Sequence, residues 1–261
     1  MNNLFIETKK VPNEKGCIFI FHGLGEHVGR YKKFIDFANE KGYSVIAPDL
    51  PGFGKSYGKR GHIESFEVYY KIMENLIKNN ESKNKIVMGH SMGGLIASRF
   101  IEVTNSHIDA LVMSGAATKL KEISAGLKLI TKFLDVVVPS ITFSNKINAD
   151  DLSYNEKSNS DYISDPLVHD KISARLFWEM KRESKKVYEN IDKIKIPTLI
   201  IHGKDDPIVS PKFSQDFFDS LKTQKKELKF IENAKHESMN EKDGYKVFQI
   251  IIDFLERLNE S

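Results

Sequence analysis

The chain has 261 residues, is 40% hydrophobic, and carries 39 basic and 36 acidic residues for a formal net charge of +3. A chain of this length and hydrophobic content can bury one substantial core, and length alone allows one or two domains. The alternation of strands and helices along the chain favours a single domain over residues 1–261. Charges of both signs are mixed along the chain, and no basic stripe is interleaved with aromatic residues. We therefore expect no nucleic-acid partner.

Short runs of β-forming residues alternate with stretches of helical periodicity. The expected strands are Leu4–Glu7, Cys17–Phe21, Ser44–Ala47, Lys85–Met88, Ala110–Met113, Thr198–Ile201 and Leu228–Ile231. The expected helices are Tyr31–Lys41, Phe66–Lys78, Leu95–Val103, Pro211–Lys222 and Tyr245–Leu258. Near-continuous apolar strands that alternate with helices predict an α/β fold, with a mostly parallel central sheet and helices on both faces.

Residues 119–186 interrupt this alternation, because no buried strand is expected between Lys119 and Lys186. Within this segment Gly126–Val138 is amphipathic to apolar, Asn145–Ser160 is polar and rich in turn residues, and Ile172–Val187 has a helical pattern. The apolar content is too small for a separate core. We therefore expect an insertion that folds over one edge of the sheet.

The single cysteine, Cys17, excludes an internal disulfide and begins an apolar run, so we expect it to pack in a strand rather than to act as a nucleophile. The N-terminus shows no basic-then-apolar secretion signal, and no run of 18 apolar residues occurs. We therefore expect a cytoplasmic protein.

Residues 89–94, Gly-His-Ser-Met-Gly-Gly, form a Gly-x-Ser-x-Gly motif between an expected strand and an expected helix. A serine on such a sharp turn has strained dihedral angles, and the glycines on either side avoid collisions with it. The turn presents the Ser91 hydroxyl at a helix N-terminus, where the Met92 amide and the helix dipole favour negative charge. Ser91 is the candidate nucleophile.

A serine nucleophile needs a base and a third group that orients the base, and two loops supply them. Asp205 and Asp206 follow the strand Thr198–Ile201, and His236 follows the next strand. Loops at the carboxyl ends of parallel strands converge, and the order Ser, Asp, His is the one expected for a serine on a strand–helix elbow. Asp206 is preferred because the following proline biases it toward an extended conformation, whereas Asp205 is suited to capping the next turn.

The chain has eight histidines, and His236 is the one we select as the base. His90 is expected to point away from the neighbouring serine. His22 and His202 end apolar strands before a glycine, where packing is the expected role. The remaining candidates lie in polar stretches without a catalytic partner nearby in sequence: His62, His107 and His169.

A tetrahedral intermediate also needs amide donors for its oxyanion. Met92 supplies one, and the loop at residues 22–27, His-Gly-Leu-Gly-Glu-His, is expected to supply the Leu24 amide, because the flanking glycines let the backbone turn toward the cleft. The competing interpretation is a phosphate-binding glycine loop. That loop would need a third spaced glycine or a Lys-Ser/Thr pair, which are missing here.

With these motifs the chain resembles the α/β-hydrolase superfamily and, within it, the monoacylglycerol lipase/lysophospholipase group of serine hydrolases. The resemblance covers nearly the whole chain outside the insertion. It is carried by residues 21–27 with Arg30 and Tyr31, residues 49–56 (Asp-Leu-Pro-Gly-Phe-Gly-Lys-Ser), residues 89–94, Gly203 with Asp206, and His236-Glu237 with Asn240-Glu241.

The resemblance implies an α/β-hydrolase fold, a catalytic triad and an oxyanion hole made by two backbone amides. The triad residues are Ser91, Asp206 and His236, and the amides are those of Leu24 and Met92. The resemblance also implies that residues 119–186 form a cap over the active site. The stretch Gly126–Val138 would line an acyl tunnel and contact lipid at a membrane surface, or pack wholly on the core.

Glu26 and Arg30 are expected near the polar head of the substrate, by the same resemblance. The alternative is a mutual ion pair that holds their loop in shape. Some members of the group carry a second histidine three residues after the catalytic one, near the glycerol moiety, and here that position is Met239. This departure concerns the preference for the head group and leaves the ester chemistry unaffected.

We therefore expect a serine esterase or lipase, independent of cofactors and metals, that hydrolyses a single-chain acyl ester, above all monoacylglycerol. A lysophospholipase or a short-chain carboxylesterase would use the same residues, and haloperoxidase-like and carbon–carbon hydrolases share the triad. An alternative of another class is a hydrolase-like protein that binds a small apolar ligand without turnover. The complete set of serine, acid and histidine argues against that alternative, and the oligomeric state is left open.

Overall fold

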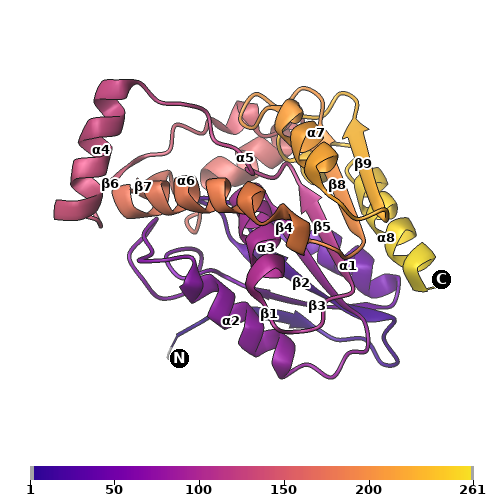
Figure 1. Cartoon of the computed structure of the whole chain (residues 1–261). Helices are drawn as coiled ribbons and strands as arrows, with labels where there is room; N and C mark the ends of the chain where they lie inside the picture. Colours follow the sequence, from indigo (N-terminus) through magenta and orange to yellow (C-terminus); the bar gives the residue numbers. More distant parts are fainter. Residues whose placement is uncertain (1–2, 260–261) are drawn as a thin grey trace.

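The computed structural model describes residues 3–259, and its centre is a seven-stranded sheet with helices on both faces (Figure 1). The strand order is β1-β3-β2-β4-β5-β8-β9, and every neighbouring pair is parallel except β1 with β3. The strands are β1 Ile6–Lys9, β2 Gly16–Phe21, β3 Tyr43–Pro48, β4 Lys85–His90, β5 Ala110–Ser114, β8 Thr198–Gly203 and β9 Lys226–Ile231. The predicted α/β architecture with a mostly parallel sheet is confirmed.

Helices cover the sheet in two layers because the strand side chains alternate between its faces. In β2, Phe19 and Phe21 belong to one core cluster, which includes side chains of α2, α3, α6 and α7, whereas Ile18 and Ile20 belong to a second cluster, which includes side chains of α1 and α8. Figure 1 shows α2 and α3 on one side of the sheet and α8 on the other. The helices outside the insertion are α1 Lys32–Glu40, preceded by the 3-10 turn η1 Val28–Tyr31, then α2 Glu67–Lys78, α3 Met92–Val103, α7 Pro211–Ser220 and α8 Tyr245–Asn259.

Most of the predicted elements are found within a few residues of their expected bounds. Cys17 lies in β2, where burial raises the pKa of its thiol to about 12, in agreement with a packing role. The largest differences are at β1, which is shifted toward the C-terminus relative to the expected Leu4–Glu7, and at α3, which begins at Met92 rather than Leu95.

Residues 119–186 contain helices and a small separate sheet. The elements are α4 Ala125–Val137, β6 Thr142–Ser144, η2 Ala149–Asp151, α5 Glu156–Ser164, β7 Lys171–Ser173 and α6 Ala174–Glu189. Strands β6 and β7 pair with each other, antiparallel, and α6 packs on α3. The helix α5 lies partly in Asn145–Ser160, a stretch that was expected to be rich in turns. It was not predicted because its sequence is polar and lacks an apolar stripe. Among residues 3–259, no helix is long and apolar enough to cross a bilayer.

Candidate active site

Ser91 occupies the sharp turn between β4 and α3, with φ 53° and ψ −119°. This left-handed conformation is strained for a residue with a side chain. The turn is possible because its neighbours are glycines. A Cβ at Gly89 would overlap the carbonyl oxygen of Gly93, and a Cβ at Gly93 would overlap that of Phe21. The second of these close approaches also brings the end of β2 directly against the turn.

Three of the predicted site residues form one hydrogen-bonded chain. The Ser91 hydroxyl lies 2.9 Å from Nε2 of His236, and Nδ1 of His236 lies 2.7 Å from Oδ2 of Asp206. In this chain the serine donates to the imidazole and the imidazole donates to the carboxylate. Asp205, the alternative acid, instead accepts a hydrogen bond from the Tyr154 hydroxyl at 3.3 Å. The structure thus brings Ser91, His236 and Asp206 together, from loops after three different strands.

Asp206 is held as an ionised carboxylate. Its Oδ1 accepts hydrogen bonds from the Ile208 and Val209 amides at 2.8 and 2.9 Å, and its Oδ2 accepts from two imidazoles. Burial alone would raise the pKa of this carboxyl, but the charge of His236 and the hydrogen bonds from His202 and His236 outweigh it and lower the pKa. The carboxylate therefore keeps its charge beside the imidazole.

The electrostatic surroundings make His236 a stronger base than an ordinary histidine. Burial lowers its pKa, but the Asp206 charge and hydrogen bond raise it more, so the net pKa is raised. The ring of His90 lies 4.8 Å from that of His236, and burial lowers the pKa of His90 to about 3. His90 is therefore neutral, and it adds no competing positive charge next to His236.

The loop after β2 is held in place beside Ser91. His22 accepts a hydrogen bond from the Leu50 amide at 2.9 Å and lies 2.8 Å from the Gly23 carbonyl, to which it donates. Gly25 adopts φ +80°, a conformation that favours glycine. Met92 is the first residue of α3, where backbone amides have no helical partner one turn earlier. Whether the Leu24 and Met92 amides face an oxyanion stays a prediction.

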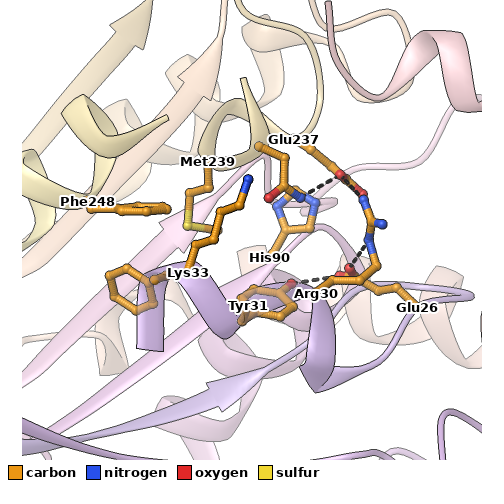
Figure 2. A pocket seen from close by; sticks show the side chains of 10 residues that line it. Glu26, Arg30, Tyr31, Lys33, His90, Glu237, Met239 and Phe248 are labelled. Carbon is orange, nitrogen blue, oxygen red and sulfur yellow. Dashed lines mark hydrogen bonds and ion pairs between the residues drawn. The ribbon is translucent and has the colours of Figure 1, made fainter. Parts of the chain in front are cut away.

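Glu26 and Arg30 are paired with each other inside the protein, together with Glu237 (Figure 2). Arg30 Nε lies 3.5 Å from Glu26 Oε2, and Arg30 Nη2 is hydrogen-bonded to Glu237 Oε2. Glu26 Oε1 also accepts from the Gly23 amide at 2.6 Å and the Tyr31 hydroxyl at 2.7 Å. The mutual ion pair offered as an alternative is therefore present, and a contact with substrate stays a prediction.

This ion triad, Glu26–Arg30–Glu237, joins the loop that carries Leu24 to the loop that carries His236. The guanidinium also lies 4.8 Å from the ring of Tyr162 in α5. Sequence reasoning missed Glu237 as a member of the site, although its position directly after His236 was a signal. Met239 lines a small cavity beside the triad with Phe248 (Figure 2).

His202 is buried at the end of β8, in agreement with the packing role predicted for it, but it also makes a contact that the sequence did not predict. Its Nε2 lies 2.9 Å from Oδ2 of Asp206, so it contacts the proposed site directly. The signal in the sequence was the four-residue spacing from His202 to Asp206 across the end of β8.

The fold and the Ser91–His236–Asp206 chain together define a serine hydrolase with the α/β-hydrolase fold. The chain belongs to the family described as "Serine aminopeptidase, S33", which matches residues 12–243. Its similarities identify it as an α/β hydrolase of the esterase and lipase type.

Three relatives illustrate this placement. Phospholipase YtpA of Bacillus subtilis is 29% identical over 93% of this chain and 95% of its own length. An uncharacterized abhydrolase domain-containing protein of Dictyostelium discoideum is 33% identical over 86% of this chain, which spans only 24% of that longer protein. The crystal structure of Paleococcus ferrophilus monoacylglycerol lipase superposes with a TM-score of 0.91 at 33% identity, covering 98% of this chain and 99% of that one.

Proposed function

We propose that this protein is a serine lipase that hydrolyses monoacylglycerol to a fatty acid and glycerol. The observation that carries the proposal is the continuous hydrogen-bonded chain from the Ser91 hydroxyl through His236 to Asp206. The similarity to a solved monoacylglycerol lipase over 98% of this chain supports the substrate class.

The reaction begins when the Ser91 oxygen attacks the ester carbonyl carbon and His236 Nε2 takes the serine proton. The resulting oxyanion is stabilised by the Leu24 and Met92 amides. His236 then gives its proton to the departing glycerol oxygen as the carbon–oxygen bond breaks, which leaves an acyl group on Ser91. Water attacks this acyl-enzyme with His236 again as the base, and the fatty acid departs as the serine recovers its proton.

Asp206 supports both halves of this cycle without being protonated. Its charge stabilises the imidazolium that forms in each half, and its hydrogen bond to Nδ1 leaves the Nε2 lone pair facing Ser91. The lowered pKa of Asp206 and the raised pKa of His236 both suit these roles.

We further propose that residues 119–186 form a cap within a single domain, and that α4 gives this cap transient contact with a lipid surface. Among the described side chains of α4, Leu129 is 73%, Phe133 63% and Val136 77% exposed, so the helix does not pack wholly on the core. Its buried member is Asp135, which is 2.5 Å from Arg175 and 3.0 Å from Arg182. The helix is thus anchored through charge and turns apolar side chains outward, as expected of a surface that contacts lipid.

Lysophospholipid is the second candidate substrate. It is favoured by the similarity to phospholipase YtpA, which extends over nearly the full length of both chains. The resemblance places a second histidine of some group members at the position of Met239, so the head-group contacts of this chain would differ from theirs. Both candidates use the same ester chemistry at Ser91.

The test compares monoacylglycerols with lysophospholipids of the same acyl chain, and with short-chain esters, for the wild type and for Ser91→Ala. We expect the highest kcat/KM on monoacylglycerol and a loss on the order of a million-fold in kcat for Ser91→Ala. Ser98→Ala is the matched control, because Ser98 lies in α3, which begins directly after Ser91, and its hydroxyl donates to the Leu95 carbonyl at 2.9 Å. Faster turnover of lysophospholipid would select the second candidate.

An absence of Ser91-dependent turnover, together with no labelling of Ser91 by a fluorophosphonate, would contradict the enzymatic proposal. It would favour a protein that binds an apolar ligand without hydrolysing it.

A further inference from the structure

Asp206 lies between two histidines, only one of which faces Ser91. His202 at the end of β8 is fully buried, and its Nε2 is 2.9 Å from Oδ2 of Asp206. This is the same oxygen that accepts from His236 at 2.7 Å. The carboxylate therefore divides its hydrogen-bonding capacity between the proposed base and a second imidazole.

The neighbours of His202 fix which of its nitrogens carries the proton. Nε2 also lies 3.0 Å from the Val209 carbonyl oxygen, and both this oxygen and the carboxylate are acceptors only, so Nε2 must donate. In the neutral ring Nδ1 is then an acceptor, and the hydroxyl of Ser214 in α7, 2.6 Å away, donates to it. Ser214, His202 and Asp206 thus form a second serine–histidine–aspartate chain, directed away from Ser91 into the core.

We propose that His202 is a positioning residue for the hydrolytic reaction, which holds Oδ2 of Asp206 against His236 and takes up part of its charge, with Ser214 fixing the His202 tautomer. This inference rests on the proposed function, since His202 acts through the same carboxylate. The other oxygen of Asp206 is already held by two backbone amides. With His202 in place, the carboxyl group has no freedom to rotate away from the base.

The test compares two substitutions of similar size. His202→Gln keeps an N–H group near the position of Nε2, and His202→Leu removes it. Both leave Ser91, His236 and Asp206 unchanged. The measurements are kcat and KM on a soluble ester, the pH dependence of kcat/KM, and thermal unfolding as the control for folding.

For His202→Leu we expect kcat to fall about tenfold with KM little changed, because a hydrogen bond to a charged group is lost. We also expect the acidic limb of kcat/KM to move upward by about half a pH unit, since Asp206 no longer shares its charge and holds the His236 proton more tightly. His202→Gln should stay within about twofold of the wild type, with its limb unmoved.

A shift of the acidic limb of kcat/KM reports on the contact between His202 and Asp206, because the other groups around His236 are the same in all variants. They are His90 from β4, Glu26 from the loop after β2, and the adjacent Glu237. If the Leu and Gln variants lose activity equally, or if neither limb moves, His202 only packs in the core and the inference is wrong. If His202→Leu does not fold, Ser214→Ala takes its place, with a smaller upward movement expected.

A spectroscopic measurement separates this inference from the proposed function. The downfield proton NMR spectrum of the wild type should show two imidazole N–H protons that are hydrogen-bonded to Asp206. This measurement does not depend on catalytic turnover. His202→Leu should remove one resonance and shift the other, whereas an unshifted second resonance would overturn the inference. Wild-type protein that shows this spectrum but no Ser91-dependent hydrolysis would refute the proposed function alone.

Discussion

Replacing Arg30 by methionine removes the positive charge that pairs with both Glu26 and Glu237 in the ion triad. The three side chains are 7%, 6% and 5% exposed, so water cannot solvate the two carboxylates that remain. A charge left buried without its partner is strongly unfavourable, even where the intact pair contributes little net stability. The substitution also removes the contact between the guanidinium and the Tyr162 ring.

The expected loss is about 3–5 kcal/mol in the free energy of unfolding, the range for breaking a buried pair by removing one partner. For a chain of this size about 1 kcal/mol lowers Tm by roughly 2–4 °C, so Tm should fall by roughly 6–20 °C. Restoring charge balance by adding Glu26→Gln and Glu237→Gln to Arg30→Met should recover at least half of this loss, because no carboxylate is then left unpaired.

Thermal and urea unfolding of the purified variants measure these changes. Lys32→Met is the matched control: Lys32 also pairs with a carboxylate, at 2.6 Å from Asp36, but its side chain is 77% exposed. Its Tm should be indistinguishable from that of the wild type. If Arg30→Met were no less stable than Lys32→Met, or if the triple variant were less stable than Arg30→Met, the reasoning from buried charge would be refuted.

Three further predictions concern the proposed active site and the proposed cap. Because His236 acts as a base only when neutral and its pKa is raised, kcat/KM should fall as the pH drops through a limb above the ordinary histidine value of 6.5; a limb below 6.5 would contradict this. Gly93→Ala should abolish folding or activity, since its Cβ would overlap the Phe21 carbonyl, whereas Gly126→Ala in α4 meets nothing within 4 Å and should be neutral in the same unfolding and activity assays. The double substitution Leu129→Ser with Phe133→Ser should weaken sedimentation with phospholipid vesicles and leave hydrolysis of a soluble short-chain ester unchanged; unaltered vesicle binding would argue against contact through α4.

The elements of the central sheet were predictable because their signals are local. Each buried strand is an apolar run, and the helices α1, α2 and α8 each have an apolar stripe, whereas α3 is buried over most of its surface. The strand β1 was misplaced because it lies at the sheet edge, where its bounds depend on pairing with β3, Ile6 opposite Pro48 through Lys9 opposite Val45. The helix α5 was missed because its sequence is polar and side-chain hydrogen bonds such as Asn159 to the Ser153 carbonyl anchor it.

The three residues of the hydrogen-bonded chain could be selected because parallel topology brings strand ends together. Once Ser91 is placed after β4, acids and histidines that follow other strands of the sheet become its natural partners. The contacts of His202 with Asp206 and of Glu237 with Arg30 were not predicted. Arg30 and Glu237 are 207 positions apart, and no local pattern pairs them. The sequence did offer the pairing of Arg30 with Glu26, four positions away, but it left open whether these two side chains bind substrate instead.

The orientation of α4 shows where periodicity stops being informative. An apolar stripe indicates that a helix is amphipathic, but the tertiary structure determines what each of its faces contacts. In α4 the buried Asp135 forms ion pairs with Arg175 and Arg182 of α6, and this pairing places the polar side of α4 against the protein. Those partners lie 40 and 47 positions further along the chain. The apolar side is left outward by this anchoring, which is why core packing and lipid contact could not be distinguished from the sequence.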